Sequence, residues 1–387
     1  MGSTRIKPLV AIAATLGAGA LVLSACGGGS SDGASGSSAA PESSAASSSA
    51  AGESPAAEGA CAPEDIFLVQ SGRGLENEYY IAVDAGAQQF AKSVGLEGNY
   101  QWIASDGDSA KQQSQIEQLL AEHGACTVLN VDPNESAILP AILDSVNREG
   151  AWMVVQWNRP EGVTPATSGK HFVAFMSEDG YVQGYETAKA LFEAMGGKGN
   201  IIALQGILDN TVAQTRFEGL QAALAEYPEI KLLGDQTAGW DRTEGQNVTQ
   251  TFITKFGDQI NGVWAANDSM GLGAVAALEA KGIKAPVSGI DGLAETLEAI
   301  QAGDGTSGMV VTTISNAANQ GGFGLAISYA AATGQIDPDT EPADHRSFYL
   351  KTNLATKANI DSVPLPDDVS GMSFGDIWSV VGGPIPE

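Results

Sequence analysis

The sequence predicts an α/β fold of two lobes, each a parallel sheet covered by helices on both faces. From about residue 66 onward, short apolar runs alternate with amphipathic helical stretches, which is the strand and helix repetition of parallel sheets. Roughly 320 residues have this globular character, and a segment of that size exceeds one comfortable hydrophobic core. Two lobes, each with its own sheet, are therefore expected.

The predicted elements follow in order along the chain. In the first half, strands are predicted at IFLVQ (66–70), YQWIA (100–104), TVLNV (127–131), WMVVQW (152–157) and HFVAF (171–175), with helices near 77–94, 109–123 and 135–148. In the second half, strands are predicted at IIALQG (201–206), IKLLGD (230–235), GVWAAN (262–267), PVSGI (286–290) and SGMVVTTI (307–314), each followed by a helix-like run. HFVAF is expected at the crossover between the lobes. Open parallel sheets bind ligands beyond the carboxyl ends of their strands, so strand ends are the candidate site positions.

The amino-terminal residues indicate export and membrane attachment. Arg5 and Lys7 precede an apolar run at 9–23 that is too short and too rich in Ala and Gly for a comfortable membrane span. The sequence then reads Leu-Ser-Ala-Cys at 23–26, which resembles the lipidation motif of bacterial lipoproteins and implies a lipid anchor on Cys26; an ordinary secretory signal is the alternative. Residues 27–59 are almost entirely Gly, Ser, Ala, Pro and Glu, a composition typical of a flexible tether.

Two further cysteines, Cys61 and Cys126, remain after Cys26. Each lies just before a predicted strand, and outside the cytoplasm the simplest expectation is a disulfide between them, with two buried free thiols as the alternative. The formal net charge of -27 argues against nucleic acid as a partner and against adsorption to anionic lipid. We expect contact with the membrane only through the anchor.

Polar and aromatic side chains recur where the predicted strands end. They are Asn77, Tyr79 and Tyr80 after the first strand, Trp157, Asn158 and Arg159 after the fourth, and Asp209, Asn210, Gln214, Trp240, Asn267, Asp268, Asp291, Ser315 and Asn316 in the second half. Amides, carboxylates and a guanidinium suit hydroxyls that both donate and accept, and flat rings can cover the C–H faces of a sugar. The set therefore favours a polyhydroxylated small molecule.

Each of these residues also has a structural alternative. Asn267, Asp268 and Asp291 could simply cap helices, and Trp157 and Trp240 could be core aromatics. Tyr79 and Tyr80 are adjacent on a predicted helix, so they are not expected to face the same direction.

Over about residues 66–333 the sequence resembles the type I periplasmic sugar-binding proteins of ABC importers, the family of the ribose-binding protein. The resemblance is carried by IIALQGILDNTVAQTRFEGLQAAL (201–224), GWDRTEGQNV (239–248), GVWAANDSMGLGAVAAL (262–278) and SGIDGLAETLEAIQAG (288–303). It implies two Rossmann-like lobes joined by a three-segment hinge that close around a ligand, which a membrane permease then receives.

The resemblance implies roles for individual residues. The ligand-binding Asn and paired aromatics fall on Asn77, Tyr79 and Tyr80, and the Asp-Arg pair falls on Asn158 and Arg159, with an amide in place of the carboxylate. In the second lobe, the stacking aromatic falls on Trp240, the binding Asn on Asn267 and the binding Asp on Asp291. A second ligand-contacting Arg falls on Gln214, whereas Arg216, two residues on, is expected to point elsewhere. A hinge-proximal residue falls on Ser315 or Asn316, of which we select Asn316, and Trp157 completes the set. Because one Arg and one Asp are replaced, we expect a ligand other than ribose.

The predicted organisation is a signal peptide at 1–25, a lipidated cysteine and tether at 26–60, an N-terminal lobe at 61–175 with 315–338, and a C-terminal lobe and tail at 176–314 with 339–387. The three histidines, at 123, 171 and 345, lack the spacing of a metal site, so we expect no metal, no cofactor and no catalytic residue. The predicted function is a monomeric, extracytoplasmic lipoprotein that binds a neutral monosaccharide or polyol for an ABC permease. A binding protein for a non-sugar ligand, such as an amino acid, a nucleoside or a signalling molecule, is the alternative.

Overall fold

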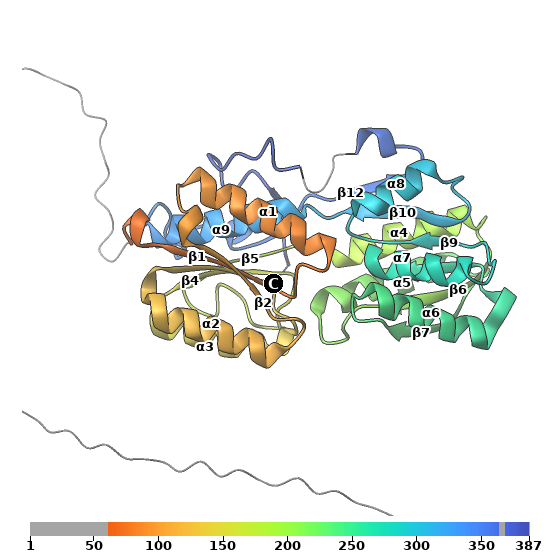
Figure 1. The fold of residues 1–387 in the computed structure, drawn as a ribbon, viewed down its shortest axis with the longest axis horizontal. Coiled ribbons are helices and arrows are strands. Elements are labelled where there is room, and N and C mark those ends of the chain that lie inside the picture. Colours follow the sequence, from red (N-terminus) through yellow and green to blue (C-terminus); the bar gives the residue numbers. More distant parts are fainter. Residues whose placement is uncertain (1–60, 364–367, 387) are drawn as a thin grey trace, which may run out of the picture. The chain divides into compact units, whose positions relative to one another are not determined.

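The computed structural model describes residues 61–363 and 368–386. The predicted lipidation site Cys26, the signal peptide and the tether all lie outside these residues. Within the described residues the chain forms two sheets. Each sheet and the helices that cover it make up one lobe, and the two are called lobe 1 and lobe 2 (Figure 1).

Lobe 1 is built on a sheet in which the described residues supply seven strands, in the order β13-β11-β5-β4-β3-β1-β2. Its strands are β1 (Phe67–Gly72), β2 (Tyr100–Ala104), β3 (Thr127–Val131), β4 (Trp152–Gln156), β5 (Phe172–Ser177), β11 (Ser347–Leu350) and β13 (Val381–Pro384). Its longer helices are α1 (Glu78–Ser93), α2 (Ser109–His123), α3 (Leu139–Glu149) and α9 (Ala317–Ala332), and the short α10 (Ala343–Arg346) precedes β11. Pairing is parallel except between β11 and β13.

Successive residues of the lobe 1 strands serve opposite faces of the sheet. In β3, Val128 packs with the cluster that includes Ala87 of α1 and Leu325 of α9, whereas Leu129 packs with Ile116 of α2 and other residues of α2 and α3. This alternation buries the sheet on both sides, with α1 and α9 on one face and α2 and α3 on the other (Figure 1).

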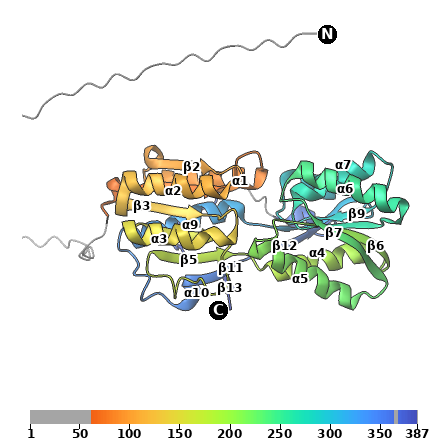
Figure 2. The ribbon, with the colours of Figure 1, turned by 90° about the horizontal axis from the view of Figure 1, so that it is seen from below.

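Lobe 2 is built on a sheet in which the described residues supply six strands, in the order β12-β10-β9-β8-β6-β7. Its strands are β6 (Gly199–Gln205), β7 (Ile230–Thr237), β8 (Gly262–Ala265), β9 (Pro286–Ser288), β10 (Gly308–Ile314) and β12 (Asn353–Thr356). Its helices are α4 (Gly180–Ala194), α5 (Thr211–Glu226), α6 (Arg242–Phe256), α7 (Asp268–Glu279) and α8 (Ala294–Ala302). The strands pair in parallel except β10 with β12, and α4 and α5 cover the face opposite α6 and α7 (Figure 2).

The chain passes between the two sheets through three short connections in the described residues, at 178–179, 315–316 and 351–352. HFVAF is the strand β5 within lobe 1, and the first connection follows it. The prediction that the tail belongs with the C-terminal lobe was wrong for most of its length. Strands β11 and β13 extend the lobe 1 sheet, and β12 adds an edge strand to lobe 2.

Hydrophobic burial explains why the tail returns to lobe 1. Phe348 of β11 is fully buried, and the tail residues Met372, Phe374, Ile377 and Trp378 pack against the cluster around it. These apolar groups are covered by α9 and by strands of lobe 1, which removes them from water.

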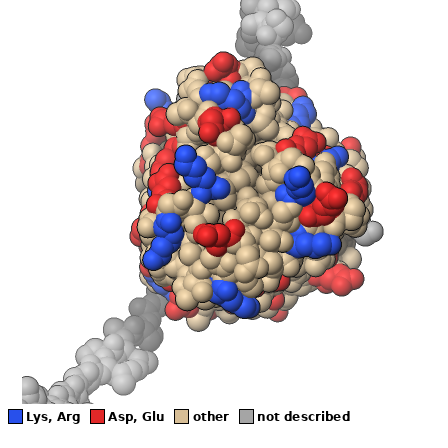
Figure 3. Space-filling model, turned by 90° about the vertical axis from the view of Figure 1, so that its right-hand side faces the viewer, with Lys and Arg blue, Asp and Glu red and all other residues tan. Residues whose placement is uncertain are grey.

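The described surface carries both signs of charge. On the lobe 2 end of the molecule shown in Figure 3, Lys and Arg side chains are interspersed with Asp and Glu side chains. The large negative net charge is therefore not gathered into one patch on this face.

Candidate functional site

A pocket lies where the carboxyl ends of strands from both lobes meet, the place expected for a ligand in an open parallel sheet. It contains about 500 Å³ of space between its lining atoms, part of it open to solvent. Lobe 1 contributes Arg73, Asn77, Tyr79, Tyr80, Asp132, Pro133, Asn134, Trp157 and Asn158, and lobe 2 contributes Asn210, Val212, Arg216, Trp240, Asn267 and Asp291.

On the lobe 1 side, Asp132 organises its neighbours. It directly follows β3, and its two carboxylate oxygens accept hydrogen bonds from the Tyr80 hydroxyl at 2.9 Å and from the Asn158 amide at 3.1 Å. Burial raises the pKa of Asp132 to about 7, opposed by these two hydrogen bonds and by Arg73. Through these two hydrogen bonds Asp132 holds Tyr80 and Asn158 in place.

On the lobe 2 side, Arg216 holds its neighbours in place, as Asp132 does in lobe 1. Its guanidinium donates to the backbone oxygen of Ala266 at 2.7 Å and to Gln183 Oε1 at 3.1 Å, and it lies 3.9 Å from an Asp291 carboxylate oxygen. Burial lowers the pKa of Arg216 and raises that of Asp291 well above its ordinary value, while each charge partly offsets the effect on the other. The two groups form a buried ion pair on one wall of the pocket.

Two indoles stand beside this guanidinium. The Arg216 carbon Cζ lies 5.1 Å from the ring centroid of Trp157 and 5.6 Å from that of Trp240, which is cation–π range. The Trp157 indole donates to the Tyr79 hydroxyl at 2.6 Å, and the Trp240 indole donates to Asn210 Oδ1 at 2.8 Å. Each ring is thus fixed by its polar edge while its face borders Arg216.

The space for the Trp240 ring depends on a glycine. A Cβ atom at Gly206, directly after β6, would lie 2.0 Å from Cζ2 of Trp240. Any larger residue at position 206 would displace the indole.

The backbone is strained where it enters the pocket. Trp157, Trp240 and Asp291 have positive φ angles of 60°, 68° and 129°, conformations that L-residues other than glycine rarely adopt. Such residues cost of order 1–3 kcal/mol each and tend to occur at functional sites. These are three of the four non-glycine residues with positive φ among the described residues, and all three line the pocket; the fourth, Asp106, does not.

Three buried polar atoms around the pocket have no hydrogen-bond partner among the described residues. They are Asn134 Nδ2, Asn158 Oδ1 and Arg73 Nη1. Asn134 and Asn158 are 3% and 5% exposed, so leaving these atoms unpaired is costly. Around the pocket, lobe 1 therefore has two donors and one acceptor that no described residue satisfies.

The predicted site residues fall into two groups. Those that line the pocket are Asn77, Tyr79, Tyr80, Trp157, Asn158, Trp240, Asn267 and Asp291, and those that lie outside it are Arg159, Gln214 and Asn316. Tyr79 and Tyr80 are adjacent and both line the pocket, and their hydroxyls bond to different partners, Trp157 and Asp132. Their rings meet edge to face at the first turn of α1, where Asn77 caps the helix by accepting from the Tyr79 backbone N–H at 3.0 Å.

Arg159 and Gln214 line a neighbouring groove on the far side of Trp157. The Arg159 guanidinium lies over the Phe175 ring at 4.7 Å and donates to the backbone oxygen of Val163. Gln214 is exposed and donates to the backbone oxygen of Leu208. The third residue outside the pocket, Asn316, belongs to the second connection between the lobes, where its backbone N–H donates to Glu178 at 2.9 Å.

The expectation that Arg216 points away from the site was wrong. The buried residues of α5 are Val212, Ala213, Arg216, Gly219, Leu220 and Ala223, a spacing of three and four that places Arg216 on the buried face and Gln214 on the opposite one. That pattern could have identified Arg216 from the sequence.

The sequence interpretation also missed Arg73, Asp132, Pro133, Asn134 and Val212, and did not select Asn210. Asp132 and Asn134 follow β3 immediately, so the strand-end rule that found Trp157 and Asn158 would have found them too.

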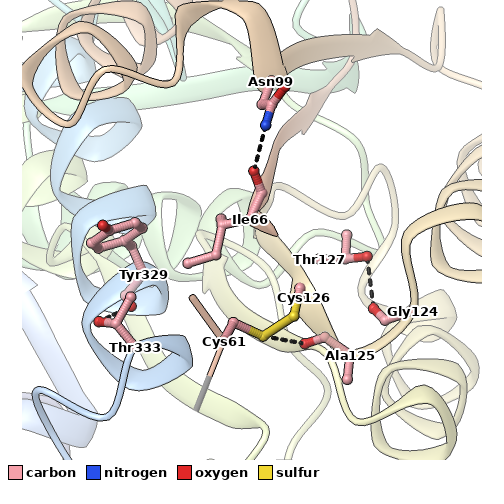
Figure 4. Close-up of a disulfide and its surroundings, with 9 residues drawn as sticks. All are labelled: Cys61, Ile66, Asn99, Gly124, Ala125, Cys126, Thr127, Tyr329 and Thr333. Atoms are coloured by element: carbon pink, nitrogen blue, oxygen red, sulfur yellow. Dashed lines mark hydrogen bonds between the residues drawn. A yellow bond between two sulfur atoms is a disulfide. The ribbon is translucent and has the colours of Figure 1, made fainter. Parts of the chain in front are cut away.

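At the opposite end of the lobe 1 strands, Cys61 and Cys126 form a disulfide with a Cα–Cα distance of 5.7 Å. Figure 4 shows it beside Ile66 and Tyr329. Cys126 directly precedes β3, whereas Asp132 directly follows the same strand. The Cys61 backbone N–H donates to Ala332 at the end of α9. The disulfide therefore attaches the first described residue to lobe 1 away from the pocket.

Two other features are absent from the part of the chain that the structure describes. There, no group of three or more His, Cys, Asp or Glu side chains is arranged to hold a metal ion. Among the same residues, no helix has the length and apolarity needed to cross a membrane.

Comparison with known proteins identifies the family. A model described as "Periplasmic binding protein domain" matches residues 71–336. The chain is 31% identical over 277 residues to the xylitol-binding protein of Mycolicibacterium smegmatis, covering 71% of this chain and 73% of that protein. It is 28% identical over 288 residues to a ribose import binding protein of Salmonella typhimurium, covering 74% and 90%. The crystal structure of a twin-arginine translocation pathway signal protein from Burkholderia phytofirmans superposes with a TM-score of 0.79 at 38% identity, covering 83% of this chain and 98% of the other. The family predicted from the sequence is confirmed, and the chain belongs to the periplasmic binding proteins of type I fold.

Proposed function

We propose that this protein binds a neutral monosaccharide or polyol in the pocket between its lobes and delivers it to an ABC permease. The observation that carries the proposal is the hydrogen-bonding character of the pocket wall. Asn134 Nδ2, Arg73 Nη1 and Asn158 Oδ1 lack partners, and a row of hydroxyls can satisfy all three because each hydroxyl donates and accepts. Relatives named for binding xylitol, ribose, apiose and allose support this class of ligand.

We assign the ligand contacts to the residues that line the pocket. Asn134, Asn158 and Arg73 act from lobe 1, and Asp291 and Asn267 act from lobe 2. Tyr79, Tyr80, Trp157 and Trp240 provide aromatic surface for C–H groups. Asp132 and Arg216 position these residues through the hydrogen bonds and the ion pair described above.

The cellular setting is part of the proposal. Residues 1–25 act as a signal peptide, Cys26 carries the lipid anchor, and residues up to 60 form the tether that carries a monomeric binding protein on the outer side of the membrane. A transport role without catalysis fits the binding function of the family. The Gly-x-Ser-x-Gly sequence at 371–375 lies in neither a helix nor a strand, whereas a nucleophile elbow requires a strand-to-helix turn.

A ligand screen by thermal shift and calorimetry tests the proposal on the purified full chain. Xylitol, other pentitols, ribose, allose, inositol, amino acids and nucleosides are compared, and a true ligand at 100 times its Kd should stabilise the protein by about 2.7 kcal/mol. Asn134→Ala and Asp291→Ala should abolish the response. Gln214→Ala is the matched control, because Gln214 occupies a family ligand position in sequence but is exposed. A response to an amino acid or nucleoside without one to any sugar or polyol would overturn the ligand assignment.

A further inference from the structure

The two lobes are joined across the pocket rim by hydrogen bonds that involve no ligand. They connect residues 209–211, at the start of α5 in lobe 2, with residues 134–137 and 159 of lobe 1. We call residues 209–211 the latch.

The latch makes several hydrogen bonds for so small a segment. The Ala137 backbone N–H donates to Asp209 Oδ2 at 3.1 Å, and Asn210 Nδ2 donates to the backbone oxygen of Asn134 at 2.9 Å. The Thr211 hydroxyl donates to the backbone oxygen of Arg159 at 2.6 Å.

A serine completes the set. The Thr211 backbone N–H lies 3.3 Å from Ser136 Oγ, and the two hydroxyl oxygens lie 3.2 Å apart. Because the Thr211 hydroxyl donates to Arg159, the Ser136 hydroxyl is the donor of this pair. The Thr211 hydroxyl and the Thr211 backbone N–H therefore both bond to lobe 1.

Asn210 connects the latch to the pocket. Its side chain is 1% exposed, and while Nδ2 donates to lobe 1, Oδ1 accepts from the Trp240 indole at 2.8 Å. The orientation of a pocket-lining ring is thus tied to the contact between the lobes.

We propose that Asp209, Asn210 and Thr211 are positioning residues that stabilise the closed arrangement of the lobes before any ligand is bound. The inference rests on the proposed function, binding by lobe closure. It assigns to Asp209 and Thr211, which do not line the pocket, an effect on affinity that needs no contact with the ligand. A ligand binds the closed arrangement, so its apparent Kd equals the intrinsic Kd divided by the closed fraction. Weakening the latch lowers that fraction and must raise the Kd of every ligand by the same factor.

The test uses Asp209→Ala and Thr211→Val, alone and combined. Valine keeps the branched shape of threonine and removes the hydroxyl's bonds to Arg159 and Ser136, while the backbone bond to Ser136 remains. Each lost hydrogen bond of ordinary strength corresponds to about a fivefold change, so the combined variant should raise Kd by about 5- to 100-fold. The factor should be equal for xylitol, ribose and allose, provided that each binds the parent protein. Thr215→Val is the matched control, because the Thr215 hydroxyl bonds only to Thr211 and Val212 oxygens of its own helix among the described residues.

A second measurement needs no ligand and separates failure of this inference from failure of the proposed function. Nitroxide labels on Ser114→Cys of α2 and Thr251→Cys of α6, both exposed positions, report the distance between the lobes in the free protein. The latch variants should shift the distribution toward longer distances, and Thr215→Val should not. An unchanged distribution would overturn the inference whether or not a sugar binds. A change in the ratio of the Kd values for different ligands would also overturn it, because the latch residues would then act on the ligand itself.

Discussion

Replacing Arg216 with methionine should be among the most damaging single changes in the described part of the chain. The guanidinium is 3% exposed and supports three neighbours: the Ala266 backbone oxygen, Gln183 and Asp291. Methionine retains most of the apolar volume but leaves those acceptors without their donor. Removing one partner of a buried ion pair costs about 3–5 kcal/mol, since the remaining charge is buried without compensation.

The loss should depend on pH in a defined direction. Arg216 is the largest influence that lowers the pKa of Asp291, so its removal raises that pKa further. Protonation of Asp291 at lower pH then relieves the unpaired charge, and the destabilisation by Arg216→Met should shrink as the pH falls. Sugar or polyol binding should be lost, because Asp291 and both indoles lose their support.

Urea unfolding followed by tryptophan fluorescence at several pH values measures the effect. Arg242→Met is the matched control, because Arg242 pairs with Glu295 at 2.6 Å but both side chains are 45–49% exposed, and exposed pairs contribute about 0–1 kcal/mol. A loss of less than about 1 kcal/mol for Arg216→Met, equal to that of the control, would refute the reasoning about the buried pair.

Three further predictions concern other parts of the chain. Burial raises the pKa of Glu178 to about 7 from an ordinary 4.5. Between these pH values the folded protein binds a proton at Glu178 that the unfolded chain does not bind. The free energy of unfolding should therefore fall as the pH rises through this window. Glu178→Gln should remove on the order of 3 kcal/mol of that fall, and urea unfolding with the same pH slope as the parent would contradict the assignment. Gly206→Ala should displace Trp240 and weaken ligand binding at least tenfold, as measured by calorimetry. Gly98→Ala is the control and should leave the affinity unchanged, because nothing lies within 4 Å of the new Cβ. Equal ligand affinities of Gly206→Ala and the parent protein would show that the pocket tolerates the shift. Replacing Cys61 and Cys126 with serine opens a loop of 65 residues and should lower stability by about 4 kcal/mol while leaving the ligand Kd unchanged; a changed Kd would mean that the disulfide influences the pocket.

Much of the fold followed from local patterns in the sequence. The strands of both lobes up to β10 occur where apolar runs end in polar residues, because a strand buried on both faces must be apolar until it reaches the sheet edge. The same logic located Trp157, Asn158, Asn267 and Asp291 at the pocket.

The remainder depended on contacts distant in sequence. Strand β13 pairs with β11, and nothing local to residues 381–384 indicates which sheet accepts them. Arg159 turns to Phe175 and Val163 rather than to the pocket, which depends on the residues packed around it and not on its place after a strand. The exchange of roles between Gln214 and Arg216 shows the limit of transferring positions from relatives, because a shift of two residues on a helix reverses which side chain is buried.

The return of the tail to lobe 1 has a consequence for the order in which the protein folds. Synthesis proceeds from the amino terminus, so β1 to β5 are made first, but β11 and β13 of the same sheet come after residue 346. The β6 to β10 core of lobe 2, by contrast, is encoded in one continuous segment from 199 to 314. The half of the molecule that is made first is therefore the half that is completed last, and until the final strand arrives its unfinished sheet edge is exposed to other chains.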